Sequence, residues 1–146
     1  MNSKLLLCLA LVLSGAVTIS TAQVQPPPLR IVIKVSQATI HIKKKFTVAL
    51  RVENPTATNQ AVRVMSCSWW DEWQSNNPKI SPIPWGYSDN GPITVQIPPG
   101  GAYTNELEVC IYKPIPDKIV TFRMGFTPIG SKKAFWSNEQ TIEVVP

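Results

Sequence analysis

Proline restricts this chain more than any other residue type. All 14 prolines of the 146-residue sequence lie after residue 22, where they make up about 11% of the residues, roughly twice the average usage. A helix interior does not accept proline at that density, because the ring removes a backbone N–H donor and clashes with the preceding turn. Since 44% of the residues are hydrophobic and only 16% are charged, the chain still has enough apolar side chains for a folded core. These features predict an all-β domain rich in loops.

The first 22 residues have the pattern of a secretory signal peptide. Lys4 supplies a positive charge, residues 5–12 form an apolar run, and the small residues 20–22 precede Gln23. A signal peptidase reads this order of features, so we expect cleavage before Gln23 and a secreted or periplasmic protein. No other apolar run approaches the ~20 residues that a membrane-spanning helix needs, so we expect no stable membrane insertion.

Beyond a proline-rich linker at residues 23–28, apolar and polar residues alternate in short runs. The clearest is 46–53, in which every second residue is apolar. Seven such runs are visible, over residues 29–35, 46–53, 60–70, 93–97, 103–112, 120–126 and 140–145. Alternation with one polar face is typical of antiparallel sheets that pack in pairs. Residues 29–146 are therefore predicted to form a seven-stranded antiparallel immunoglobulin-like β-sandwich, with a closed barrel as the alternative.

Two turn motifs connect these runs, VENPT at 52–56 and IPPGG at 97–101. The order of strands and turns, with a long aromatic loop between the motifs, resembles the immunoglobulin-like modules of exported bacterial proteins over most of residues 29–145. The chain is also distantly similar to β-sandwich proteinase inhibitors of the BsuPI type, which implies proteinase inhibition as one function. It departs from that pattern in its twin tryptophans and long proline loop, so no inhibitory residue is carried over.

Removal of the predicted signal peptide leaves two cysteines, Cys67 and Cys110. An exported chain meets an oxidising compartment, which favours a disulfide between them. The alternation of Leu107, Val109 and Ile111, however, places Cys110 on the opposite, polar face of its strand. The pair is therefore predicted to form a peripheral disulfide or to remain as two free thiols.

Aromatic residues gather in one segment, residues 69–87. It holds Trp69, Trp70, Trp73, Trp85 and Tyr87. Residues 71–91 show no strand pattern. A loop of that length is longer than most loops that only connect two strands. In a strand, the two adjacent tryptophans would point to opposite faces. The loop could therefore fold on its own tryptophans, or it could present them to a protein or a carbohydrate.

Residues that could carry catalysis are few. His41 is the only histidine. A metal site usually needs more histidine or cysteine ligands, and a catalytic nucleophile would have to pair with this one histidine. The adjacent carboxylates Asp71 and Glu72 would point apart on an extended chain. The three lysines at 43–45 lack the interleaved aromatics of a nucleic-acid-binding face. We expect no enzyme activity, no cofactor, no metal and no nucleic-acid partner.

The sequence thus predicts a secreted or periplasmic non-catalytic module that binds a protein partner through residues 69–87. A carbohydrate-binding module that uses the same tryptophans is one alternative. An inhibitor of an extracellular proteinase is the other.

Overall fold

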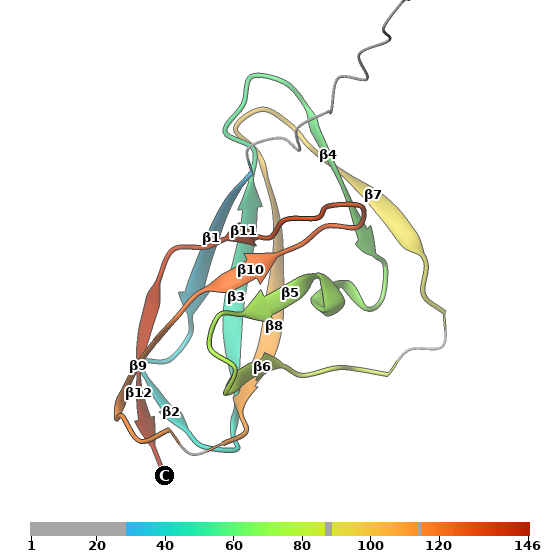
Figure 1. Cartoon of the computed structure of the whole chain (residues 1–146). Helices are drawn as coiled ribbons and strands as arrows, with labels where there is room; N and C mark the ends of the chain where they lie inside the picture. The colour runs from blue at the N-terminus through green and yellow to red at the C-terminus, as the bar shows by residue number, and fades with distance from the viewer. Residues whose placement is uncertain (1–28, 87–88, 114) are drawn as a thin grey trace, which may run out of the picture.

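The computed structural model describes residues 29–86, 89–113 and 115–146 (Figure 1). The predicted signal peptide (1–22) and linker (23–28) lie outside these residues. Within them the chain forms one short 3-10 helix and twelve strands: β1 (Arg30–Val35), β2 (Thr39–His41), β3 (Lys45–Glu53), β4 (Gln60–Met65), η1 (Trp69–Glu72), β5 (Trp73–Ser75), β6 (Ile80–Pro82), β7 (Pro92–Ile97), β8 (Ala102–Ile111), β9 (Ile119–Phe122), β10 (Met124–Phe126), β11 (Phe135–Trp136) and β12 (Gln140–Val145). No helix of the described chain has the length and hydropathy to cross a membrane.

Four strands form the main antiparallel sheet, in the order β1-β3-β8-β6. Strand β3 lies between two partners, so that Leu50 faces Ile33 of β1 and Asn105 of β8. Buried and exposed residues alternate along β3 as its sequence predicts: Leu50 is buried, whereas Ala49 and Arg51 are exposed. The apolar face of this strand is one wall of the core.

A second layer faces the main sheet. It consists of two three-stranded sheets, in the orders β11-β10-β5 and β2-β12-β9. In Figure 1, β5, β10 and β11 cross in front of the long strands of the main sheet. Phe46 of β3 meets Phe122 of β9 edge to face, with ring centroids 6.5 Å apart. Both rings are buried, so the core lies between the two layers.

The remaining strands, β4 and β7, form a separate two-stranded antiparallel ribbon. Figure 1 shows this ribbon beside the main sheet. Its inner face contributes Val62, Val64 and Ile97 to the core.

The nearly all-β architecture with antiparallel sheets is confirmed, but the strand count is different. Twelve strands in four sheets replace the seven predicted strands, and one pair, β2 with β12, is parallel. The predicted run 120–126 divides at Arg123, where the Asn76 side chain accepts the Arg123 N–H at 2.7 Å in place of a strand partner. The two halves, β9 and β10, consequently join different sheets.

The two turn motifs of the sequence meet in space. Gly101 N–H donates to the Pro98 carbonyl at 2.9 Å, and Gly100 has a φ of 68°, a conformation that glycine adopts without strain. Buried Asn54 holds this turn: its N–H donates to the Gly101 carbonyl, and its side-chain amide donates to the Ile97 carbonyl at 2.8 Å. The VENPT turn thereby fixes the IPPGG turn.

The structure contains no Cys67–Cys110 disulfide, and both residues are free thiols. Cys110 lies near the end of β8, paired with Lys45 of β3 and Ser81 of β6. Cys67 follows the end of β4, which belongs to the separate ribbon, and Figure 1 shows these two strand ends well apart. The predicted disulfide is therefore wrong, and the alternative of two free thiols describes this structure.

Candidate functional site

The structure separates the four tryptophans of the predicted five-residue binding site. Trp70 and Trp73 are buried in the main core, and Trp69 is half-buried against it. Trp85 is 51% exposed, and Tyr87 lies outside the described residues. The predicted segment therefore provides core residues at its beginning and a surface tryptophan near its end.

Trp69 and Trp70 do not lie on a strand. They begin the 3-10 helix η1, and their rings pack edge to face with centroids 6.2 Å apart. The expectation that they would point to opposite faces of a sheet is therefore wrong, because the predicted 60–70 strand already ends at Met65.

Trp73 enters the core through strand pairing that the sequence does not reveal. It faces Phe126 across the β5–β10 pair, and the two rings lie 4.9 Å apart. Trp73 and, further along the segment, Ile80 thus pack in the main core of the domain instead of forming a separate small core.

The connection that carries Trp85 is held at both ends. At its start, the Ile83 N–H donates to the Glu108 carbonyl at 2.9 Å. At its end, the side-chain oxygen of Asn90 accepts the N–H groups of Cys67 and Ser68 at 3.1 and 3.2 Å. Sequence reasoning missed Asn90, although an Asn-Gly pair before a strand is a turn signal. The connection is therefore a loop tethered at both ends, and the exposed indole of Trp85 lies two residues after the first tether.

Other exposed apolar groups lie along the same connection. Pro84 and Pro92 are exposed, and Ile93, at the start of β7, is 46% exposed. Ile93 faces Val64 of β4, which is fully buried. The core face of the ribbon thus becomes solvent-exposed at the start of β7, whereas Ile97 at its end is buried. We call Pro84, Trp85, Pro92 and Ile93 the loop surface.

The outer edge of β7 adds backbone hydrogen-bonding groups to this region. Ser66 N–H donates to the Gly91 carbonyl at 2.9 Å, so in an antiparallel ladder the odd-numbered residues of β7 bond to β4 and the even-numbered ones point away. Thr94 and Gln96 are therefore directed outward, and both are exposed. In the described part of the chain, β7 has no strand partner other than β4.

Glu72 is a buried carboxylate at the opposite edge of the ribbon. It is 6% exposed, and its Oε1 accepts the Met65 N–H at 3.0 Å on the outer edge of β4. Its Oε2 has no hydrogen-bond partner. Burial raises the pKa of Glu72, and the charge of Asp71 acts in the same direction, whereas the backbone hydrogen bonds lower it.

The raised pKa predicts how stability depends on pH. The folded state holds the Glu72 proton more tightly than the unfolded chain does, so this group's stabilising contribution is present below about pH 4.5 and is lost as pH rises through the folded-state pKa. Glu72→Gln removes the charge and keeps an acceptor for Met65. Urea unfolding across pH should therefore find the variant more stable than the wild type at neutral pH, with the difference shrinking toward pH 4. Glu106→Gln, on an exposed carboxylate, is the control, and an identical pH profile for both variants would contradict the assignment.

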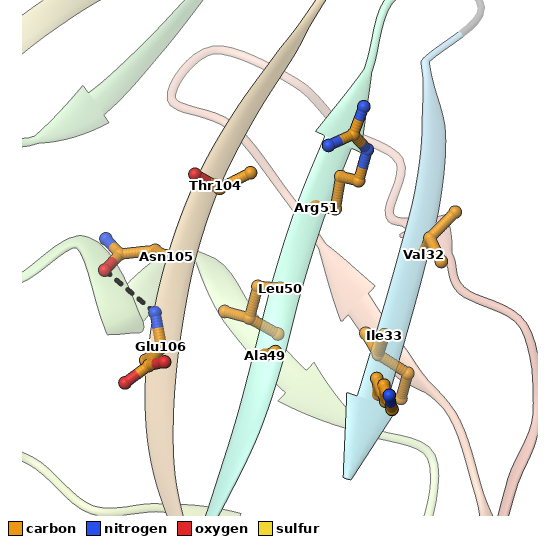
Figure 2. Close-up of a pocket in the computed structure, with 9 residues that line it drawn as sticks. Val32, Ile33, Ala49, Leu50, Arg51, Thr104, Asn105 and Glu106 are labelled. Atoms are coloured by element: carbon orange, nitrogen blue, oxygen red, sulfur yellow. Dashed lines mark hydrogen bonds between the residues drawn. The ribbon is translucent and has the colours of Figure 1, made fainter. Parts of the chain in front are cut away.

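A shallow hollow of about 570 Å³ lies on the outer face of the main sheet, over β1, β3 and β8 (Figure 2). Small Ala49 lies between the longer side chains of Lys34 and Glu106, to which it is paired across the sheet. Arg51 at its rim forms a salt bridge with Glu53. The hollow is thus an open sheet face with mixed charges and no nucleophile paired with a base.

The histidine and the adjacent carboxylates considered as catalytic residues lie far apart. His41 is exposed on β2, and its Nδ1 lies 3.1 Å from the Pro146 carbonyl oxygen. Asp71 and Glu72 lie in η1, next to β5, and Figure 1 shows β2 and β5 in different parts of the fold. No group of three or more histidine, cysteine, aspartate or glutamate residues within the described ranges could hold a metal ion.

Comparison with known proteins assigns this chain to no family. No family model and no curated protein matches the sequence. Among solved structures, an alkylpurine DNA glycosylase from Pseudomonas fluorescens, bound to DNA with an abasic-site analogue, has a TM-score of 0.43 at 11% identity, over 82% of this chain and 31% of the other. A β-glucosidase from Erythrobacter marinus has a TM-score of 0.41 at 12% identity, over 80% and 16%. The chain therefore spans less than a third of either protein, and likeness at this level carries no argument about function.

Proposed function

We propose that this chain is an exported, non-catalytic module that binds another protein through the loop surface and the outer edge of β7. The observation that carries the proposal is Trp85, half exposed on a loop tethered at both ends. Tryptophan is enriched at binding hot spots because it buries a large area with little loss of side-chain entropy. The tethers and the flanking prolines reduce the ordering cost of binding.

A free strand edge next to an exposed tryptophan suits a partner that is itself a polypeptide. An extended segment could pair with the outward groups of Thr94 and Gln96, and its side chains could contact Trp85 and Ile93. A sugar platform would need flat, coplanar exposed indoles, but Trp69 is half-buried and inclined by 73° to Trp70. A protein partner is thus favoured over a carbohydrate, and an exported proteinase is one protein that could supply such a segment.

We further propose that the domain is an immunoglobulin-like sandwich with the β4–β7 ribbon added. Three features support this: the strand order β1-β3-β8-β6 in one layer, the pairing of β12 with both β2 and β9 in the other, and a buried tryptophan, Trp73, on the short edge strand β5. In such sandwiches, binding loops project from a rigid scaffold. Trp85 lies on a loop of this kind.

Trp85→Ala tests the proposed binding surface. A partner retained by the wild-type domain from the secreted proteins of its source should bind the variant about 30-fold more weakly or worse, the scale of a 2 kcal/mol hot spot. The free energy of unfolding should change by about 0.5 kcal/mol or less, because the side chain is exposed.

Trp136→Ala is the matched control, since Trp136 is an exposed tryptophan on β11. Its binding should equal that of the wild type. Equal binding by the Trp85 variant would refute the loop surface as the contact site.

A further inference from the structure

Six lysines gather at the end of the domain where β8 finishes and β9 begins. They come from three separate parts of the sequence: the β2–β3 turn, the β5–β6 turn and the β8–β9 connection. The six are Lys43, Lys44, Lys45, Lys79, Lys113 and Lys118. We call this region the basic end; it lies at the bottom of Figure 1, near the C-terminus.

Backbone hydrogen bonds hold these segments together. The Lys43 N–H donates to the Ile111 carbonyl at the end of β8 at 3.0 Å, and the Tyr112 N–H donates to the Lys79 carbonyl at 3.3 Å. The Lys118 carbonyl accepts an N–H from β12 at 2.6 Å. The lysines are thus brought together by rigid strand ends.

Most of this positive charge is not neutralised. Lys45 forms a salt bridge with Glu108 at 3.0 Å, and it is the only one of the six with a salt bridge among the described residues. Asp117 lies on the β8–β9 connection, and Glu143 of β12 is paired with Thr39 of β2. Six lysines against these three side-chain carboxylates leave an excess of positive charge that attracts anions.

Exposed apolar side chains accompany the lysines. Tyr112 is 50% exposed, and Ile119, at the start of β9, is 60% exposed. Both flank the connection that carries Lys113 and Lys118. A surface that meets a charged interface with an apolar layer beneath it would bury these two side chains while the neighbouring lysines stay in the charged layer.

We propose that the basic end binds peripherally to the surface of an anionic lipid bilayer. The lysines would lie among the negative headgroups, and Tyr112 and Ile119 would reach the boundary with the acyl chains. All six basic residues are lysines, whose ammonium groups act as point charges and attract diffuse negative charge. A site that binds individual phosphates would favour the bidentate guanidinium of arginine. Nucleic acid would also attract the lysines, but it has no apolar layer in which the Ile119 side chain could be buried.

Vesicle co-sedimentation tests the proposal with the full chain. The protein should bind vesicles of equal phosphatidylglycerol and phosphatidylcholine, and should not bind phosphatidylcholine alone. The double variant Lys44→Gln, Lys113→Gln should bind the anionic vesicles about 25-fold more weakly, because each lysine near such a surface contributes about fivefold. Lys132→Gln, Lys133→Gln makes the same change in net charge on the β10–β11 connection and should bind like the wild type.

A second pair of variants distinguishes a membrane from a polyanion. Ile119→Ser should weaken vesicle binding, whereas Ile93→Ser, at an isoleucine on β7 that is 46% exposed, should not. Absence of binding to anionic vesicles, or equal loss in both lysine variants, would overturn the proposal. So would an unchanged affinity of Ile119→Ser together with tight binding to a single-stranded oligonucleotide, which would identify a polyanion site.

Discussion

Replacing Trp73 by alanine should destabilise the domain by about 3–5 kcal/mol, the usual cost of truncating a buried aromatic side chain. Trp73 is almost fully buried and packs its ring against Phe126 at 4.9 Å. It also begins β5, the edge strand that connects η1 to the second layer. A small domain has a total stability of about 5–15 kcal/mol, so the variant should be close to unfolding.

Urea denaturation followed by far-UV circular dichroism would measure this cost. Trp73→Phe is the informative companion, because the indole Nε1 is buried without a hydrogen-bond partner. Phenylalanine removes this unsatisfied donor and keeps most of the ring, so it should recover most of the lost stability. A loss below about 1 kcal/mol in the alanine variant would mean that β5 does not anchor the layer.

Leu50→Ala is the second large effect, with an expected cost of about 2–5 kcal/mol. Leu50 lies at the middle of β3, almost fully buried, between strands on both sides. Its neighbour Arg51 points to the other face and forms a salt bridge with Glu53, which is also bonded by Arg30. An exposed ion pair of this kind is worth little, so Arg51→Ala should cost about 0.5 kcal/mol or less.

The same denaturation experiment compares the two variants. The ratio of their costs reports whether only one face of β3 is covered by the core. Similar losses for Leu50→Ala and Arg51→Ala would show that something covers the outer face of the main sheet, including the hollow over Ala49.

Those parts of the fold that depend on local patterns could be predicted from the sequence. Period-two alternation located β3 and β8, because each is long enough to show its apolar face. The motifs around Asn54 and Gly100 were recognised as turns, because the residues that make such turns are few. The proline content excluded a helical fold. The density of tryptophan pointed to the segment that contains Trp85.

The tertiary structure decided what depends on contacts between distant segments. Strands of three residues, such as β5 and β6, are too short to show a period, and they form because β10 and β8 supply hydrogen-bond partners. The same pairing buries Trp73 and leaves Trp85 at the surface, although both occur in one aromatic segment. The separation of Cys67 from Cys110, and the hydrogen bonds that join Lys43 and Lys79 to the end of β8, follow from where strands end. A local pattern does not contain that information, because it is set by the packing of the two layers.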